Sequence, residues 1–188
     1  MKKFVVIVSI LVLAMGLAAC SSGNGSTGTN SSDNSSSTSS GTSASSSSTQ
    51  SNYYFKDNVA ETEDVKIVIT DYKVIQPGET GNEYGDQPVI AFWYDTTNKS
   101  GKEVSPMIAW MAIFTAYQDT NPNQVNKLNV GMLPDSAFSD TQLEDIKQGG
   151  TASNAMSYEL DDTSTPVVLK ATKGLAGADL GEQEYSLL

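Results

Sequence analysis

Cys20 carries the only thiol of this 188-residue chain, and the chain has no histidine. The other reactive side chains are hydroxyls, 11 lysines and 22 carboxylates. Without histidine, neither a Ser-His-Asp or Cys-His nucleophile nor a histidine-ligated metal can be assembled. The Ser-x-x-Lys spacing and the glycine-rich phosphate loop are missing as well. A pair of carboxylates, as used in glycoside hydrolysis, is the catalytic chemistry that the composition still allows.

Carboxylates are too numerous for their clustering to identify a site. The expected folded domain holds 21 of them, so close pairs arise by chance and we expect no enzyme. Three runs also gather oxygen ligands of the kind that calcium prefers, but none has EF-hand spacing, and such runs are usually solvated faces. The three runs are 61–64 (ETED), 140–145 (DTQLED) and 159–162 (ELDD). We therefore expect no metal and no cofactor, with calcium binding as the weaker alternative.

Cys20 stands at the end of the apolar segment that opens the chain. Lys2 and Lys3 precede the largely apolar run 4–17, which is as long as a signal-peptide core and too short to span a bilayer. The residues Leu-Ala-Ala-Cys resemble the bacterial lipobox, which implies cleavage before Cys20 and a diacylglyceryl or palmitate-type lipid on its thiol. The alternative is an ordinary signal followed by an incidental cysteine. We interpret Cys20 as the lipid attachment site.

A serine-rich segment follows the cysteine. Of the 31 residues 21–51, 16 are serine and nearly all others are glycine, threonine or asparagine. No sizeable apolar side chain is available to offset the entropy of ordering, which predicts a disordered tether, with a glycosylated stalk as the alternative. The sequence thus predicts a lipoprotein signal peptide (1–19), a lipidated cysteine with a disordered Ser-rich tether (20–52) and a folded domain (53–188).

The folded domain is strongly acidic. Because Lys2, Lys3 and Asp33 lie outside it, the 11 lysines and 22 acids of the chain fall to 9 and 21, a net charge of about −12. Nucleic acid is bound through basic side chains that neutralise phosphates, so we exclude it as a partner. Anionic lipid head groups would repel the domain. We expect membrane contact through the lipid on Cys20, at the extracytoplasmic face of the cell membrane.

Alternating apolar residues predict an all-β domain that depends on its core, because it has no thiol for a disulfide. The alternation changes phase near 70–71, which indicates a β-bulge or a bend. The run entered at Pro88 is apolar in both phases, as in a central strand. Turn signals separate the runs at intervals typical of a sandwich; the expected strands are 65–70, 72–74, 88–98, 152–160, 166–172 and 183–187.

The segment 105–118 fits two structures. It opens with Ser-Pro, as a helix can, and Met107, Trp110, Met111 and Phe114 have helical spacing. Alternate residues also fit a strand, and periodicity cannot decide in so uniformly apolar a run. We expect a strand from about Ala112 to Gln118, preceded by a helical turn or loop.

Three stretches resemble a family of Gram-positive lipoproteins built around domain of unknown function 5067. The resemblance covers the folded part, from roughly Phe55 to the C-terminus, and implies an immunoglobulin-like β-sandwich. It implies no activity, cofactor or catalytic residue, and only Cys20 carries over. The stretches are DYKVIQPGETGNEYGDQPVIAFWYDTTNKSGKEVSPMIAW, FTAYQDTNPNQVNKLNVGMLPD and NAMSYELDDTSTPVVLKATKG.

These observations predict a membrane-anchored lipoprotein whose domain is a non-catalytic interaction module, with a cell-surface protein or glycan as its ligand. The alternative is a carboxylate-based cell-wall hydrolase or its accessory subunit. Sandwiches bind partners through loops at one end or by strand addition, and the polar connections 77–87 and 119–126 are the candidate loops. Trp93 and Trp110 could line a sugar-binding face, but aromatic residues of sandwiches are more often core, which we expect for both.

Overall fold

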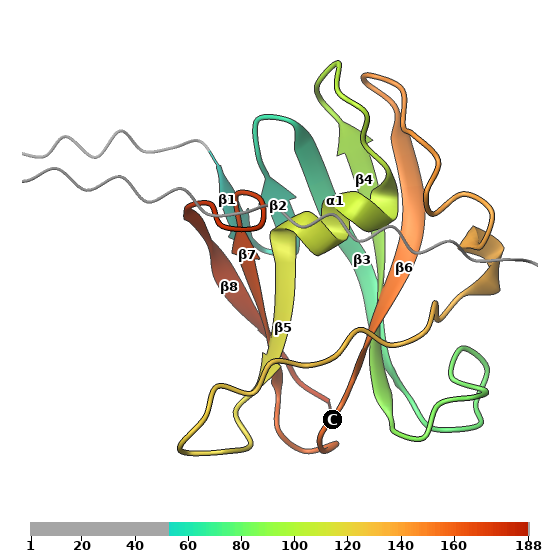
Figure 1. Cartoon of the computed structure of the whole chain (residues 1–188), viewed down its shortest axis with the longest axis vertical. Coiled ribbons are helices and arrows are strands. Elements are labelled where there is room, and N and C mark those ends of the chain that lie inside the picture. Colours follow the sequence, from blue (N-terminus) through green and yellow to red (C-terminus); the bar gives the residue numbers. More distant parts are fainter. Residues whose placement is uncertain (1–52, 188) are drawn as a thin grey trace, which may run out of the picture. The chain divides into compact units, whose positions relative to one another are not determined.

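The computed structural model describes residues 53–187. The expected signal peptide, the tether and Cys20 lie outside these residues. Within them, two antiparallel sheets pack against each other (Figure 1). Sheet A has the strand order β1-β2-β3-β4-β6 and sheet B the order β5-β7-β8. The strands of sheet A are β1 (Tyr54–Lys56), β2 (Val59–Glu61), β3 (Val65–Ile75), β4 (Val89–Asn98) and β6 (Thr151–Glu159), and those of sheet B are β5 (Phe114–Gln118), β7 (Val167–Thr172) and β8 (Asp179–Tyr185).

The inner faces of the two sheets form one hydrophobic core. Phe92 and Tyr158 from sheet A, and Leu169 from sheet B, belong to the same buried cluster. Burying such a side chain stabilises the fold by about 1.5–3 kcal/mol. Alternation along each strand supplies this inner face, so the mostly β architecture expected from the sequence is confirmed.

The change of phase in β3 is a β-bulge, one of the two alternatives that the sequence left open, and 65–70 and 72–74 belong to one strand. The register of β3 against β4 shifts between Ile69 and Asp71, so one residue is left without an opposite partner. Beyond the bulge, Tyr72 lies opposite Phe92, and the two rings stack with centroids 6.2 Å apart. The central position of β4 is also confirmed, because β4 pairs with β3 on one side and β6 on the other.

The all-β prediction needs one correction, the helix α1 (Pro106–Ile113). The segment 105–118 contains both expected structures, but the helix has two turns and β5 begins at Phe114 rather than near Ala112. Its buried residues have helical spacing; they are Pro106, Ala109, Trp110 and Ile113. Ile108 and Met111 face outward, which makes the helix apolar on all sides and explains why periodicity could not identify it.

Strands β1 and β2 have no counterpart among the strands expected from the sequence, and β8 (Asp179–Tyr185) begins before the expected strand 183–187. Asp57 and Asn58 form the turn between β1 and β2 with positive φ angles of 51° and 63°. Among the residues that the structure describes, no helix has the length and apolar character needed to cross a membrane.

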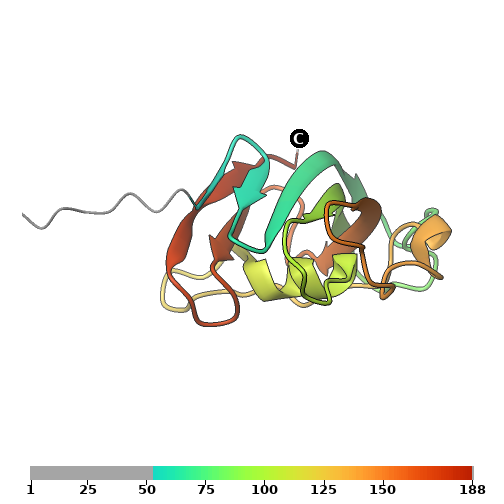
Figure 2. The same ribbon diagram turned by 90° about the horizontal axis from the view of Figure 1, so that it is seen from above.

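One connection, the segment 126–132, pairs with one edge strand of each sheet, β5 and β6. On β5, Gln118 N–H donates to the Asn126 carbonyl (3.1 Å), and Leu128 N–H donates to Ala116 (2.9 Å). On β6, Gly131 N–H donates to the Ser157 carbonyl at 2.9 Å. Helix α1 spans the same side of the sandwich between β5 and β6 (Figure 2). The edge of β5 and the C-terminal end of β6, which would otherwise present unpaired backbone groups, are therefore occupied.

Candidate functional site

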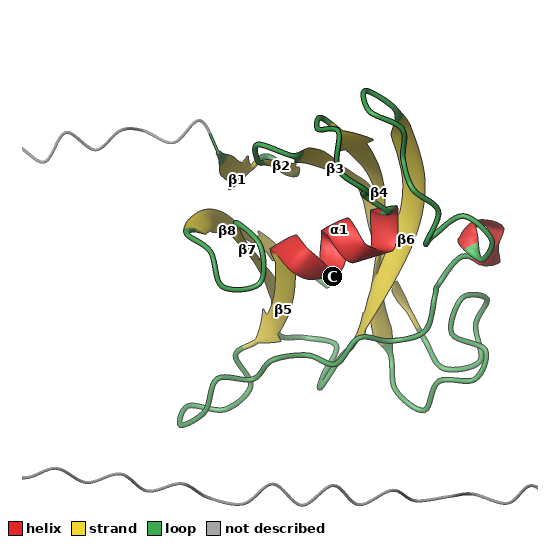
Figure 3. Cartoon of the chain, turned by 45° about the horizontal axis from the view of Figure 1, so that its top comes forward, coloured by secondary structure: helices red, strands yellow, loops and turns green. Residues whose placement is uncertain are grey.

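The two loops proposed as contact loops lie at the same end of the sandwich, opposite α1 (Figure 3). They are the β3–β4 connection, which contains 77–87, and the segment 119–126 that follows β5. The β6–β7 connection, residues 160–166, reaches this end as well (Figure 1). The sequence indicates both loops as polar connections, but only the structure shows that they converge.

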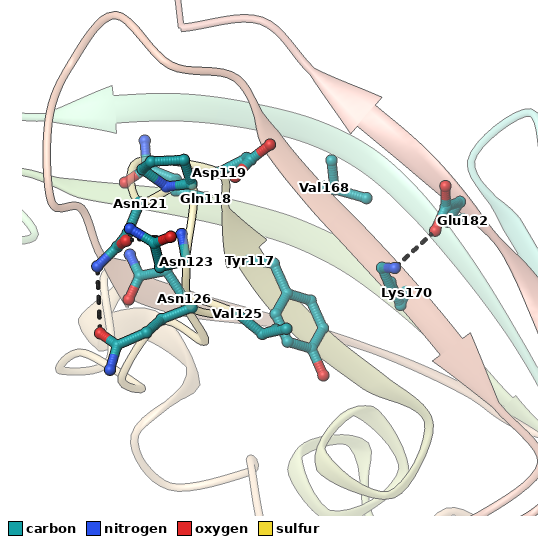
Figure 4. A pocket seen from close by; sticks show the side chains of 12 residues that line it. Tyr117, Gln118, Asp119, Asn121, Asn123, Val125, Asn126, Val168, Lys170 and Glu182 are labelled. Carbon is teal, nitrogen blue, oxygen red and sulfur yellow. Dashed lines mark hydrogen bonds and ion pairs between the residues drawn. The ribbon is translucent and has the colours of Figure 1, made fainter.

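A groove of about 530 Å³ lies between the segment 119–126 and the outer face of sheet B. We call it the Tyr117 groove (Figure 4). This volume is in the range of small-ligand sites. Its lining residues are Tyr117, Gln118, Asp119, Asn121, Pro122, Asn123, Gln124, Val125, Asn126, Val168, Lys170 and Glu182.

The floor of the Tyr117 groove is formed by outward-facing residues of sheet B. Along β5, Ala116 and Gln118 point into the domain, and Tyr117 between them is half-buried on the outer face. Lys170 of β7 lies over the Tyr117 ring, with Nζ 5.6 Å from the ring centroid. Lys170 Nζ also pairs with Glu182 of β8 at 3.1 Å. The hydrogen bond to Glu182 raises the pKa of Lys170, so this lysine stays charged.

The wall of the groove is a loop rich in side-chain amides. Asn121 Oδ1 accepts a hydrogen bond from Asn123 N–H at 2.9 Å, and Asn121 Nδ2 donates to Gln124 Oε1 at 3.1 Å. The side chain of Val125 is 86% exposed at the mouth. Within residues 53–187, the side chains of Asp119 and Asn123 have no hydrogen-bond partner, so they are available to a ligand.

A buried glutamine attaches this wall to the rest of the domain. Gln118 is 1% exposed, and its Nε2 donates to the carbonyls of Asp162 (3.1 Å) and Thr165 (2.7 Å). Gln118 Oε1 accepts from Asp161 N–H at 2.8 Å. Thr120 Oγ1 donates to the Asp161 carboxylate (3.1 Å), and Asn126 Nδ2 donates to the same carboxylate. Both ends of the loop are thus held in place.

The Asp162 carboxylate organises the turn on which Gln118 depends. Its oxygens accept hydrogen bonds from Ser164 N–H (2.7 Å) and Thr165 N–H (2.6 Å), and from both hydroxyls. The bond from Thr165 N–H contributes most to lowering the pKa of Asp162, to about 2. This carboxylate therefore has a structural role in the turn.

In two of the three acidic runs considered as calcium ligands, 61–64 and 159–162, carboxylates are already engaged in other contacts. Glu61 accepts from Lys99 Nζ at 2.6 Å, and Asp64 from Lys102 at 2.7 Å. Glu63 lies 3.6 Å from Lys173. Among residues 53–187, no group of three or more metal-ligating side chains is gathered.

A second hollow, of about 410 Å³, lies on the outer face of sheet A and is lined by Trp93. The expectation that both tryptophans are core residues holds for Trp110, which is 0% exposed. Trp93 is instead half-buried, packed on a small separate cluster of Ile75, Val89 and Ala91. Its indole N–H donates to the Asp135 carboxylate at 3.0 Å.

The loop 77–87 has a larger structural role than its sequence indicates. Asn82 is 3% exposed, and its Nδ2 donates to the carbonyls of Ile75 (3.2 Å) and Gln87 (2.8 Å). Tyr84 is 85% exposed and outside the core. Replacing residues 79–87 with a short turn would remove Asn82, so we expect such a replacement to destabilise the domain. This leaves 119–126 as the better candidate of the two loops.

A solved structure resembles this chain in fold. It comes from Staphylococcus aureus subsp. aureus NCTC 8325, is described as that of "a putative lipoprotein", and matches with a TM-score of 0.59 at 20% sequence identity. The match covers 70% of this chain and 90% of the Staphylococcus aureus chain. At this identity, the likeness concerns the fold alone. Among curated proteins, none matches the sequence.

The model of one protein family matches residues 29–173, which is more than half of the chain. The match begins inside the expected tether and ends before β8, whereas the resemblance noted in the sequence ran from about Phe55 to the C-terminus. The family is described as a domain of unknown function. The chain belongs to this family, DUF5067.

Proposed function

We propose that this protein is a membrane-anchored, extracytoplasmic lipoprotein whose domain is a non-catalytic interaction module that binds a cell-surface ligand in the Tyr117 groove. The observation that carries the proposal is the groove itself. It is open to solvent, its polar side chains have unused hydrogen-bonding capacity, and Gln118 holds its wall in place.

The anchor is supported by the residues around Cys20. Leu-Ala-Ala-Cys ends an apolar run of signal-peptide length and precedes a serine-rich segment. The similar Staphylococcus aureus protein is itself described as "a putative lipoprotein". Two acyl chains hold a protein stably on a membrane, whereas one does so only marginally.

We further propose that the sandwich is of the immunoglobulin type. In that fold, strands A, B and E are neighbours in one sheet and strands C, F and G in the other. Here β3, β4 and β6 are neighbours in sheet A, and β5, β7 and β8 are neighbours in sheet B. In chain order, β3, β4, β5, β6, β7 and β8 therefore correspond to strands A, B, C, E, F and G. The segment 126–132 pairs with β6 through Val130 and Tyr158, at the edge where strand D lies in an immunoglobulin domain.

A non-catalytic role is supported by the side chains that the groove offers. The chain has no histidine, and of the two carboxylates lining the groove, Glu182 is paired with Lys170. An interaction module leaves its ligand intact, whereas the alternative wall hydrolase would release reducing ends or peptides from purified cell wall.

The anchor is tested by Cys20→Ala. The variant should give uncleaved precursor or protein shed into the medium, and a mature protein that stays on membranes after a carbonate wash would contradict the anchor. The groove is tested by co-sedimentation with purified wall of a Gram-positive bacterium. Tyr117→Ala should reduce binding and Tyr84→Ala should not, and soluble products released from the wall would favour the hydrolase.

A further inference from the structure

We infer that the ligand of the Tyr117 groove is an uncharged glycan chain. This inference rests on the proposed interaction role of the same groove and names the chemical class that the groove selects. Four kinds of observation support it: the type of polar group, the apolar floor, the charge balance and the covered edge of β5.

The polar groups of the groove match those of a sugar. Its wall presents the side-chain amides of Asn121, Asn123, Gln124 and Asn126. An amide has both hydrogen-bond donors and an acceptor, and sugar hydroxyls likewise donate and accept. Asn121, Gln124 and Asn126 use part of this capacity within the domain, which leaves the Asn123 amide and the Gln124 Nε2 group for a ligand. The internal contacts of the loop and Gln118 already order the backbone that carries these amides, which reduces the entropy lost on binding.

The floor supplies an apolar surface for the C–H faces of sugar rings. Tyr117 lies in the middle of the groove, between the amide-bearing loop and the Lys170–Glu182 pair (Figure 4). Val125 and Val168 add apolar area on either side of it. A tyrosine ring combines such a surface with a polar hydroxyl at its end.

The charges of the groove argue against a polyanionic ligand. Lys170 and Glu182 neutralise each other at 3.1 Å. Asp119 then leaves the groove slightly negative, on a domain that carries about −12. Phosphate-rich polymers would be repelled by this field.

The two common modes of peptide binding are also disfavoured. Strand addition needs a free sheet edge, and the edge of β5 is already paired with 126–128. A bound amphipathic helix needs an apolar groove, whereas amide side chains dominate this wall. The groove therefore suits a chain that is recognised by hydroxyl groups.

The test uses the mature chain from residue 20, with Cys20→Ser to keep it in solution. Titration calorimetry is carried out with soluble oligosaccharides of chitin, cellulose and starch, and with poly(glycerol phosphate) as the anionic comparison. At least one oligosaccharide should bind. Tyr117→Ala should weaken that binding at least about tenfold, as for an aromatic residue that dominates an interface. Asn123→Ala should weaken it as well.

Tyr84→Ala is the matched control, because Tyr84 is 85% exposed and lies on the other loop. This variant should bind the oligosaccharide as tightly as the parent chain does. Thermal unfolding checks that each variant is folded. If purified wall binds through the groove but no oligosaccharide does, or if the polyanion binds better, the glycan inference is wrong and the interaction role stands. If wall binding is the same in Tyr117→Ala, the proposed function itself is wrong.

Discussion

The indole N–H of Trp110 donates a hydrogen bond of 2.8 Å to the hydroxyl of Tyr158 in the interior of the domain. Trp110 belongs to α1 and Tyr158 to β6, so the bond links the helix to sheet A. Trp110 also contacts Tyr94, Phe92 and Phe114, with ring centroids 4.3, 5.6 and 4.5 Å away. The connection between the two sheets is thus fixed by a polar contact inside an aromatic cluster.

Replacing Tyr158 with Phe should lower the free energy of unfolding by about 1–3 kcal/mol, because the buried Trp110 N–H loses its acceptor. Denaturant unfolding at neutral pH measures the change. Tyr72→Phe is the control. Because Tyr72 is 40% exposed, this substitution should change the free energy of unfolding little. Equal effects of the two substitutions would contradict the importance assigned to the buried bond.

The domain should lose stability at alkaline pH. Burial raises the pKa of Tyr158 from 10.0 to about 12, and burial raises the pKa of Tyr94 and Tyr185 as well. A pKa that is higher in the folded state means that the folded chain keeps this proton up to a higher pH than the unfolded chain does. The contribution of the protonated tyrosine to the free energy of unfolding is complete below pH 10 and is lost as pH rises through 12. Unfolding measured across this window should show the decline, with a smaller slope in Tyr158→Phe.

Asp162 should give the opposite dependence at acid pH. Its pKa is lowered from 3.8 to about 2 by hydrogen bonds, so its contribution is complete above pH 3.8 and is lost as pH falls through 2. Asp162→Ala should lower the melting temperature at neutral pH and have little effect at pH 2. Asp86→Ala, at an exposed position, is the control. An equal loss at both pH values would show that the charge of Asp162 is irrelevant.

Two glycines of the β3–β4 loop provide a matched pair. Gly78 and Gly81 both have positive φ angles, 84° and 94°, but a Cβ on Gly78 would meet nothing within 4 Å. A Cβ on Gly81 would overlap the Pro134 carbonyl oxygen. Gly78→Ala should lower the free energy of unfolding by about 1–2 kcal/mol through backbone strain alone. Gly81→Ala should lower it distinctly more, because the overlap with Pro134 adds to the strain. Similar denaturation midpoints for the two variants would show that the backbone at Pro134 moves aside without a loss of stability.

Limited proteolysis tests the domain boundary. A non-specific protease acting on the mature protein should cut within 21–52 and leave a resistant core that starts near Tyr53 or Phe55, because exposed polar coil is cut first. N-terminal sequencing and mass spectrometry identify the core. Early cuts within 65–75 or 152–172 would contradict the placement of core strands there.

Strands with a strong alternating pattern could be predicted from the sequence. The change of phase after Ile69 indicated an irregularity there, although a bend stayed open as the alternative to the bulge. The dense β-branched and aromatic residues after Pro88 predicted β4. The strands β1 and β2, of three residues each, are too short to show a period. In α1 every position is apolar or small, so the buried and exposed faces could not be told apart.

The candidate site could be predicted only as a loop. The irregular polar composition of 119–126 indicated a surface connection, but the floor of the groove comes from β5, β7 and β8, which are distant in sequence. Alternation in β5 placed Tyr117 on the face opposite Ala116, without showing what else lies on that face. The role of Gln118 was hidden because a buried glutamine in a strand resembles any other polar residue until its partners are known.

The pairing of 126–132 with β5 and β6 also bears on how many copies of this protein can share a surface. Lipid-anchored chains are confined to two dimensions and collide often, and unpaired sheet edges are the usual starting points for intermolecular aggregation. Here Ala116, Gln118 and Ser157 already use their outward backbone groups within the chain. On a membrane, where the proposed anchor on Cys20 would hold the domain, a neighbouring copy would find no template for strand exchange along β5 or at the C-terminal end of β6. Copies could therefore stand close together there as separate, folded domains.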